Sequence, residues 1–167
     1  TTMTRRIALA LTGASGMPYG VRLLECLLAS GVRVELLYSD AAQIVARQEL
    51  DLALPSNPEQ VQAQFAARFG AKPDQLAVYG REQWFAPVAS GSNPPDAMVV
   101  CPCSRGTLAS IAAGLSANLI ERAADVCLKE RRRVVLMFRE TPLHAGHIKS
   151  MLAVTEMGAI VAVPAPA

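Results

Sequence analysis

The sequence predicts an α/β fold: a doubly wound, mainly parallel sheet with helices on both faces, of the Rossmann-like or flavodoxin-like kind. Two observations predict it. Short apolar runs alternate with longer stretches of helical periodicity, a pattern typical of parallel strands joined by helical crossovers. The chain also has 167 residues, the usual size of one domain, so we expect a single domain over residues 1–167.

Six short apolar runs are the predicted strands. The first, IALAL, ends in a turn of small residues before a helical pattern begins. Another, RVVLMF, is a similar short apolar run. The predicted strands span residues 7–11, 32–38, 76–79, 97–101, 133–138 and 159–163.

The stretches between these runs carry helical periodicity. In the first of them, Val21, Leu24 and Leu28 fall on one face, and Gly31 marks the end of the helix. One long connection, residues 85–96, is rich in glycine and proline and is predicted as a loop. The predicted helices span residues 17–30, 40–48, 58–69, 104–114, 118–130 and 144–157.

Composition argues against several classes of function. Hydrophobic residues make up 51% of the chain, yet no apolar run approaches the ~20 residues of a membrane span. We therefore expect no membrane partner, and some apolar surface hidden between the subunits of a homo-oligomer. The net charge is +2 and basic residues are scattered apart from residues 129–133, so we expect no nucleic-acid partner. With no signal peptide before the first strand, we expect a cytoplasmic protein.

The cysteines and histidines do not predict a metal site. Cys101 and Cys103 form a CPC motif and the other two cysteines fall in helical patterns, which fits neither a disulfide framework nor a CxxC pair. His144 and His147 are three residues apart on a predicted helix, without a carboxylate or cysteine at ligand spacing. We expect reduced cysteines, surface or capping histidines, and no bound metal.

The residues that follow the strands are the best candidates for ligand binding, because ligands of open α/β sheets sit outside the carboxyl ends of the strands. Small or hydroxyl-bearing residues follow the first, second and fourth strands, and Arg139-Glu140 follow the fifth. Helix N-termini and hydroxyls favour anions, so a phosphate-bearing ligand is predicted. The first turn, TGASG, matches neither GxGxxG nor GxxxxGK[ST], and Ser or Thr after a strand is also an ordinary N-cap.

Other candidates carry charge or an aromatic face. Glu49 ends the helix after the second strand, where the pattern alone favours a solvated side chain. Arg122 and Lys129 are seven residues apart and share one helix face, which either presents two positive charges to an anion or faces solvent. Trp84 either packs or offers its ring to a cation. The 89–92 stretch either approaches a ligand or is a plain surface connection.

With these residues in view, the chain resembles the UbiX-type flavin prenyltransferases, most of all the bacterial members. The matching segments run in order through nearly the whole chain, and their combination is specific although each is short. They are LTGASG, E.D.AL around Glu49, W.AP.ASGS from Trp84, CPCS.GTL from Cys101, NLIERAADV.LKERR from Asn118 and RE.P from Arg139.

The resemblance implies an enzyme that binds FMN. It would join a dimethylallyl group from dimethylallyl monophosphate to N5 and C6 of reduced FMN, without a metal. The product, prenylated FMN, would serve a UbiD-type decarboxylase, for example in ubiquinone biosynthesis. The resemblance also implies a homododecamer with active sites between subunits. The choice between monophosphate and diphosphate donor stays open.

The resemblance also implies a role for each site residue. Ser15, Glu49, Lys129 and Glu140 would be catalytic, with Ser15 near flavin N5 and Glu49 transferring protons at a neighbouring subunit's site. FMN would be bound by Gly13, Ala14, Ser15, Ser39, Ser104, Arg105, Gly106, Thr107 and Arg139. The substrate would be bound by Trp84, Ala89, Ser90 and Gly91 around its dimethylallyl group and by Arg122, Lys129 and Glu140 around its phosphate.

Two features depart from the family pattern. Arg105 stands in the flavin-binding turn, where family members often carry a small or uncharged residue. The sequence ends at VAVPAPA, so we expect an FMN-binding domain without the family's C-terminal tail, which carries a tyrosine, a basic residue and a final helix. This leaves open a non-catalytic FMN-binding oligomer. An FMN-dependent decarboxylase of a cysteine derivative is disfavoured. Enzymes of that kind use a histidine in the early helical region, and here no histidine precedes His144.

Overall fold

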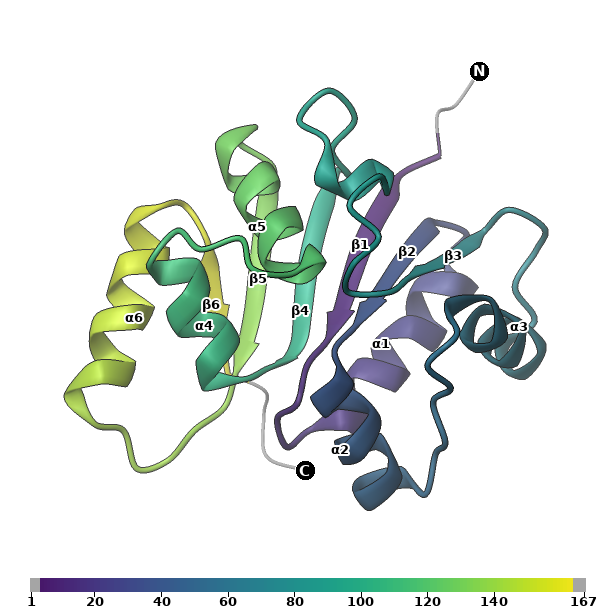
Figure 1. The fold of residues 1–167 in the computed structure, drawn as a ribbon, viewed down its shortest axis with the longest axis horizontal. Helices are drawn as coiled ribbons and strands as arrows, with labels where there is room; N and C mark the ends of the chain where they lie inside the picture. Colours follow the sequence, from purple (N-terminus) through teal and green to yellow (C-terminus); the bar gives the residue numbers. More distant parts are fainter. Residues whose placement is uncertain (1–3, 164–167) are drawn as a thin grey trace.

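The computed structural model describes residues 4–163 and contains one six-stranded sheet in which every pair of neighbouring strands is parallel (Figure 1). The strand order is β3-β2-β1-β4-β5-β6, so the order reverses between β1 and β4. This confirms the predicted doubly wound, Rossmann-like fold. The strands are β1 (Arg6–Leu11), β2 (Arg33–Tyr38), β3 (Leu76–Tyr79), β4 (Ala97–Cys103), β5 (Arg133–Phe138) and β6 (Ile160–Ala162).

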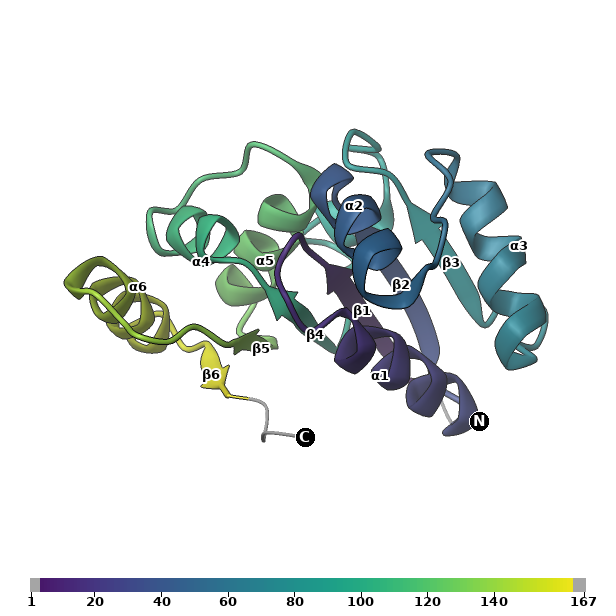
Figure 2. The same cartoon turned by 90° about the horizontal axis from the view of Figure 1, so that it is seen from below.

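Helices cover both faces of the sheet, and each face has its own buried core. One core joins the sheet to α1, α2 and α3; the other joins it to α4, α5, α6 and a short 3-10 turn, η1. Figure 2 shows the two helix layers on either side of the strands. The helices are α1 (Met17–Ala29), α2 (Asp40–Leu50), α3 (Pro58–Phe69), η1 (Pro87–Ala89), α4 (Arg105–Ala112), α5 (Leu119–Lys129) and α6 (Ala145–Glu156).

The predicted elements are all present, with ends that differ by at most two residues. Strand β4 runs on through Pro102 to Cys103, where its register with β5 shifts after Val100. A proline is tolerated in a strand at such an irregularity, because the missing N–H falls where the ladder is already broken. The one element that the sequence did not predict is η1, inside the predicted 85–96 loop.

The described residues contain neither a membrane-spanning helix nor a cluster of metal-binding side chains. No helix within residues 4–163 is both long and apolar enough to cross a bilayer. Within the same span, no three His, Cys, Asp or Glu side chains gather as metal ligands would. The ends of the predicted domain, residues 1–3 and 164–167, lie outside the described residues, as does the predicted absence of the family's tail.

Helix α1 lies very close to strand β4. A Cβ added at Gly20 would lie 2.4 Å from the carbonyl oxygen of Cys101 and 2.7 Å from Leu11 Cδ2. We expect Gly20→Ala to lower the free energy of unfolding by about 1–3 kcal/mol, because backbone must shift to admit the methyl group. Urea unfolding measures this. Gly106→Ala is the control, since its Cβ would meet nothing closer than Ser104 Oγ at 4.0 Å; an equal loss in both variants would contradict the prediction.

The four cysteines are free, and three of them are buried. Burial raises the pKa of the Cys101 thiol to about 11, and burial raises those of Cys103 and Cys127 to about 12. Because the thiolate is the reactive form, we expect one thiol per chain, that of exposed Cys26, to react with a disulfide reagent at about pH 8 in the native protein. Thiol titration measures this. Cys26→Ser should abolish the native-state reaction, and rapid labelling of a second thiol would contradict it.

Candidate active site

The residues predicted to bind flavin lie at the carboxyl edge of the sheet. Ser15, Ser39, Ser104 and Arg139 follow β1, β2, β4 and β5, whose carboxyl ends share one edge because all pairings are parallel. The reversal of strand order between β1 and β4 opens a crevice at this edge. The structure therefore brings together side chains from turns that are far apart in the sequence.

Thr12 links the two turns that flank this crevice. Its side chain is 1% exposed, its hydroxyl donates to the Pro102 carbonyl oxygen at 2.6 Å, and it accepts from the Ser104 amide at 2.8 Å. The spacing between the turn after β1 and the turn after β4 is thereby fixed. Sequence reasoning missed this positioning role, although a hydroxyl directly after a buried strand was the available signal.

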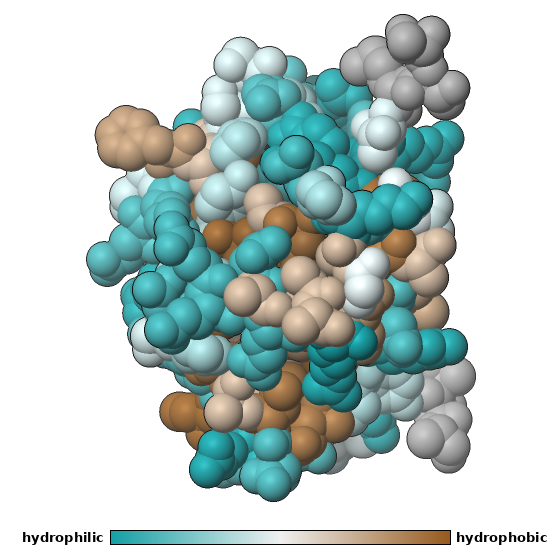
Figure 3. Space-filling model, turned by 90° about the vertical axis from the view of Figure 1, so that its right-hand side faces the viewer, coloured by the Kyte–Doolittle hydropathy of each residue, from teal (hydrophilic) through white to brown (hydrophobic). Residues whose placement is uncertain are grey.

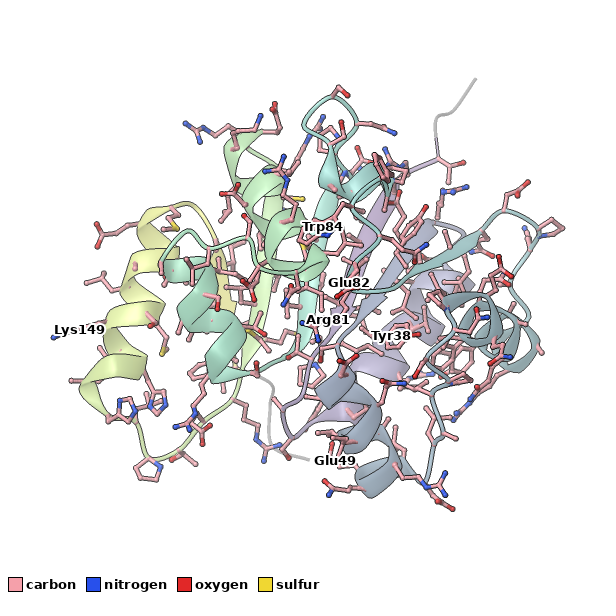
Figure 4. All side chains as sticks on the ribbon, viewed as in Figure 1. Tyr38, Glu49, Arg81, Glu82, Trp84 and Lys149 are labelled. Atoms are coloured by element: carbon pink, nitrogen blue, oxygen red, sulfur yellow. The ribbon has the colours of Figure 1, made fainter. Side chains whose placement is uncertain are left out.

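Glu49, in the last turn of α2 (Figure 4), contacts the turn after β1 of its own chain. Its carboxylate accepts from the Ser15 hydroxyl at 3.0 Å, the Gly16 amide at 3.0 Å and the Met17 amide at 2.8 Å. The N-terminus of α1 thus binds an anion, a side chain of the same chain, whereas the sequence predicted the phosphate of a ligand. The resemblance implied that Glu49 reaches a neighbouring subunit's site, whereas here it contacts its own Ser15.

The glycines of this turn are also required by packing. A Cβ at Gly13 would lie 2.3 Å from the Ala41 Cβ, so only glycine lets α2 pack against the turn. Gly16, with φ of 109°, occupies the left-handed region that favours glycine. Between them, the Ala14 amide donates to the Thr12 carbonyl oxygen at 2.9 Å. Steric need and anion binding therefore act together in TGASG.

The hydroxyls at the starts of α2 and α4 are N-caps. Ser39 accepts from the Ala42 amide and Ser104 from the Thr107 amide, both at 3.1 Å. The Ser104 hydroxyl also lies 2.9 Å from the Thr107 hydroxyl. The space beside Gly106 is open, since its nearest neighbour to an added Cβ is 4.0 Å away. These residues serve as caps, and the open backbone around them still offers N–H donors to an anion.

Charged residues complete this edge. Arg105 is the exposed first residue of α4. Arg139 and Glu140 are exposed after β5 and, within residues 4–163, make no ion pair. Both line a hollow of about 220 Å³ whose other walls include Phe138 and Met151.

The predicted substrate residues form a second cluster beside α5. Arg122 Nε donates to the Ala89 carbonyl oxygen at 3.2 Å. A Cβ added at Gly91 would lie 2.8 Å from Lys129 Nζ, so the ammonium group rests against this glycine. Lys129 also donates to the neighbouring Glu130 carboxylate, and this hydrogen bond and charge lower the pKa of Glu130. The 89–92 stretch therefore lies against both predicted cations.

Ser90 and Trp84 flank this second cluster. The Ser90 hydroxyl lies 2.8 Å from that of Ser92. Trp84 is 44% exposed in the turn that precedes η1, so part of its ring is open to a ligand.

The two clusters lie far apart within one chain. Lys129 ends α5 just before β5 begins, and Arg139 follows the end of β5. A six-residue strand is about 20 Å long, so Lys129 and Gly91 lie near the amino edge of the sheet while Ser15 and Glu140 lie at the carboxyl edge. Figure 4 shows the corresponding separation of Trp84 from Glu49. The structure does not bring Glu140 to Lys129 and Arg122, with which it was predicted to bind phosphate.

Comparison with known proteins identifies the family. The sequence profile described as Flavoprotein matches residues 1–166. The chain belongs to the Flavoprotein family. It is 51% identical over 161 residues to the flavin prenyltransferase UbiX of Pseudomonas aeruginosa, covering 96% of this chain and 77% of the relative. It is 43% identical over 165 residues to that of Neisseria meningitidis, covering 99% and 80%. These identities group it with the flavin prenyltransferases, as predicted.

Solved structures agree with this assignment. AnUbiX in complex with FMN and dimethylallyl pyrophosphate is 41% identical, with a TM-score of 0.85 over 99% of this chain and 80% of that one. A dodecameric FMN-dependent UbiX-like decarboxylase from Escherichia coli O157:H7 is 36% identical, with a TM-score of 0.83 over 97% and 81%. A PPC decarboxylase at 16% identity and a TM-score of 0.68 shares the fold alone.

Proposed function

We propose that this chain transfers a dimethylallyl group from a dimethylallyl phosphate to N5 and C6 of reduced FMN. The observation that carries the proposal is the contact between Ser15 and Glu49 on the turn after β1, beside the crevice where the strand order reverses. A hydroxyl bonded to an exposed carboxylate can pass a proton between a ligand in the crevice and water. Flavin storage alone does not require this pair.

The carboxyl edge fits FMN. A phosphate ester suits the N-terminal turn of α4 and the capping hydroxyls of Ser39 and Ser104. It also suits Arg139, which makes no ion pair within residues 4–163. When bound and reduced, FMN supplies the electron-rich ring atoms that accept the dimethylallyl group. Ser15 orients the ring edge through its hydroxyl, and Glu49 holds Ser15 in place and exchanges its proton.

The second cluster fits the other substrate. Breaking the allylic C–O bond leaves negative charge on the phosphate and positive charge on the carbon. Lys129 and Arg122 supply fixed cations for the phosphate, and the exposed ring of Trp84 supplies an aromatic face for the carbon. Glu140, at the carboxyl edge, is the remaining residue of the proposed prenyl-phosphate site and lies on the flavin side.

A complete active site then needs more than one subunit, because the two clusters lie on opposite edges of the sheet. We propose a homododecamer in which the flavin edge of one subunit meets the α5 face of another, supported by the dodecameric assembly of the Escherichia coli relative. Exposed apolar side chains fit such contacts: Ile44 is 61% exposed in a hollow shared with Leu54 and Pro55. Figure 3, which shows the right-hand side of Figure 1, has apolar surface near the bottom, at the height at which α2 lies in Figure 1.

We further propose a single FMN-binding domain in the cytoplasm, which fits four free cysteines. Its product, prenylated FMN, would serve a UbiD-type decarboxylase in ubiquinone biosynthesis or a related decarboxylation. The proposed connection to a UbiD-type decarboxylase is supported by the chemical nature of the product, prenylated FMN.

The test is anaerobic incubation with reduced FMN and dimethylallyl monophosphate or diphosphate in separate reactions, followed by mass spectrometry of the released flavin. A gain of one dimethylallyl unit, lost in Glu140→Gln, supports the proposal and identifies the donor. Bound but unmodified FMN with both donors would overturn it in favour of a non-catalytic flavin-binding oligomer.

Gly91→Ala tests the second cluster. The added methyl group would displace the Lys129 ammonium, which lies 2.8 Å from the Cβ position. We expect KM for the dimethylallyl phosphate to rise about tenfold, since one charged contact is worth about 1.5–3 kcal/mol, with little change in unfolding free energy because the displaced group is the end of a flexible side chain. Steady-state kinetics and urea unfolding measure the two effects. An unchanged KM would show that Lys129 is not held by this glycine.

A further inference from the structure

An ion pair between a buried carboxylate and a partly exposed guanidinium lies beneath the loop that carries Ser90 and Gly91. Glu35, in the middle of β2, is 1% exposed, and its Oε1 accepts from Arg6 Nε at 2.7 Å. Its second oxygen, Oε2, is buried without a hydrogen-bond partner among the described residues. Burying this carboxylate is costly, and such a pair is weak evidence of a purely stabilising role. Its place in the fold therefore calls for another explanation.

Arg6 connects this buried carboxylate to the loop. While Nε points inward to Glu35, Nη1 donates to Asn93 Oδ1 at 2.7 Å, and Nη2 donates to the Asn93 carbonyl oxygen at 3.3 Å. The Arg6 backbone adds a reciprocal pair with Asp96: its amide donates to Oδ2 at 2.8 Å, and its carbonyl accepts from the Asp96 amide at 2.9 Å. Because a guanidinium is planar and rigid, Glu35 fixes the direction in which Arg6 offers its outer donors.

The loop transmits this placement to the predicted substrate residues. The Asn93 amide donates to the Ser90 carbonyl oxygen at 3.2 Å, which ties the anchored residue to the start of the turn. Gly91, inside that turn, lies against the Lys129 ammonium. At the other end, Ala89 is held by Arg122. Residues 90–92 are thus held at both ends by an arginine: Arg122 contacts Ala89, and Arg6, oriented by Glu35, contacts Asn93.

We propose that Glu35 and Arg6 are positioning residues for the prenyl-phosphate site: they hold Ser90 and Gly91 against Lys129 and thereby set the affinity for the phosphate-bearing substrate. The inference rests on the proposed function. It concerns the substrate cluster alone, because the pair lies away from the Ser15 and Glu49 turn. It predicts an effect on prenyl-phosphate binding without an effect on FMN binding.

Asn93 offers a test that leaves the pair of Glu35 and Arg6 intact, since its side chain is exposed. Asn93→Ala removes the Oδ1 acceptor of Arg6, and Asn93→Asp retains it. We expect Asn93→Ala to raise KM for the dimethylallyl phosphate about tenfold, with kcat within about twofold and FMN affinity unchanged. Asn93→Asp should restore KM to near the wild-type value. Glu25→Gln, which breaks an exposed pair with Arg22 on α1, is the control and should change nothing.

A second variant and a second readout complete the test. Arg6→Lys keeps the charge but lacks the separate guanidinium nitrogens that contact Glu35 and Asn93, so it should raise KM at least as much as Asn93→Ala. Calorimetric titration of the oxidised, FMN-bound protein with dimethylallyl monophosphate measures affinity without turnover. Weaker binding in Asn93→Ala supports the inference even if the wild type proves inactive. Equal affinity in the wild type, Asn93→Ala and folded Arg6→Lys would overturn it, as would the absence of binding to the wild type.

Discussion

We expect that chains carrying Ser15→Ala and chains carrying Lys129→Met, each nearly inactive alone, will regain prenyl transfer when they assemble together. Each variant should lose about 10²-fold or more, the usual contribution of a proton-transfer group or a fixed cation. Ser15 follows β1 at the carboxyl edge and Lys129 ends α5 near the amino edge, so on the proposed function an active site would draw them from different subunits. In an equal random mixture, a site has a one-half chance of each intact residue, which gives about a quarter of wild-type activity in a symmetric assembly.

The matched control pairs Ser15→Ala with Glu49→Gln. These residues contact each other within one chain, so mixing the two variants should restore nothing. Co-refolding from urea, followed by the flavin mass assay, measures both mixtures. No recovery in the Ser15 and Lys129 mixture would show that one chain supplies both residues. Recovery in the control would place Glu49 at a neighbouring subunit's site, as the family resemblance implied.

Glu49→Gln should lose prenyl transfer by about 10²–10⁴-fold while the protein keeps its stability. The amide retains an oxygen that accepts from the Gly16 and Met17 amides, so the N-terminus of α1 stays capped. It cannot take up a proton from Ser15. Glu49→Ala removes both functions, and we expect the same loss of activity together with about 0.5–2 kcal/mol of unfolding free energy.

Single-turnover kinetics and urea unfolding separate these two roles of Glu49. The comparison is informative because the two variants differ in the cap alone. Wild-type activity in Glu49→Gln would reduce the carboxylate to a helix cap and would remove the main support for proton transfer through Ser15.

The fold could be predicted because its signals are local. Each strand is an apolar run bounded by a breaker, and each helix has its own periodicity, so the alternation specified a parallel sheet. The rule that ligands bind at the carboxyl ends of strands then selected the turns at Ser15, Ser39, Ser104 and Arg139. The 3-10 turn η1 was not predicted, because three residues are too few to show a hydrophobic periodicity.

The contacts that organise the site depend on pairs distant in sequence. Thr12 bridges to Pro102 and Ser104, and Glu35 pairs with Arg6 across the β1–β2 ladder. The neighbouring residues of Thr12, which follows a strand, and of Glu35, which lies within one, do not indicate which distant residues they contact. The separation of Lys129 from Glu140, by contrast, was available from the sequence, because the predicted strand at residues 133–138 lies between them and keeps one chain from bringing the two together.

Lys129 lies near one edge of the sheet and the Ser15 and Glu49 pair at the other, and this placement has a consequence for the life of each chain. On the proposed function, a newly folded subunit can hold flavin yet lacks the neighbour that would help a prenyl phosphate to ionise. A carbocation released in a half-built site would be lost to water. On this proposal, prenyl transfer depends on assembly, because a substrate can react once neighbouring subunits have completed the site around it.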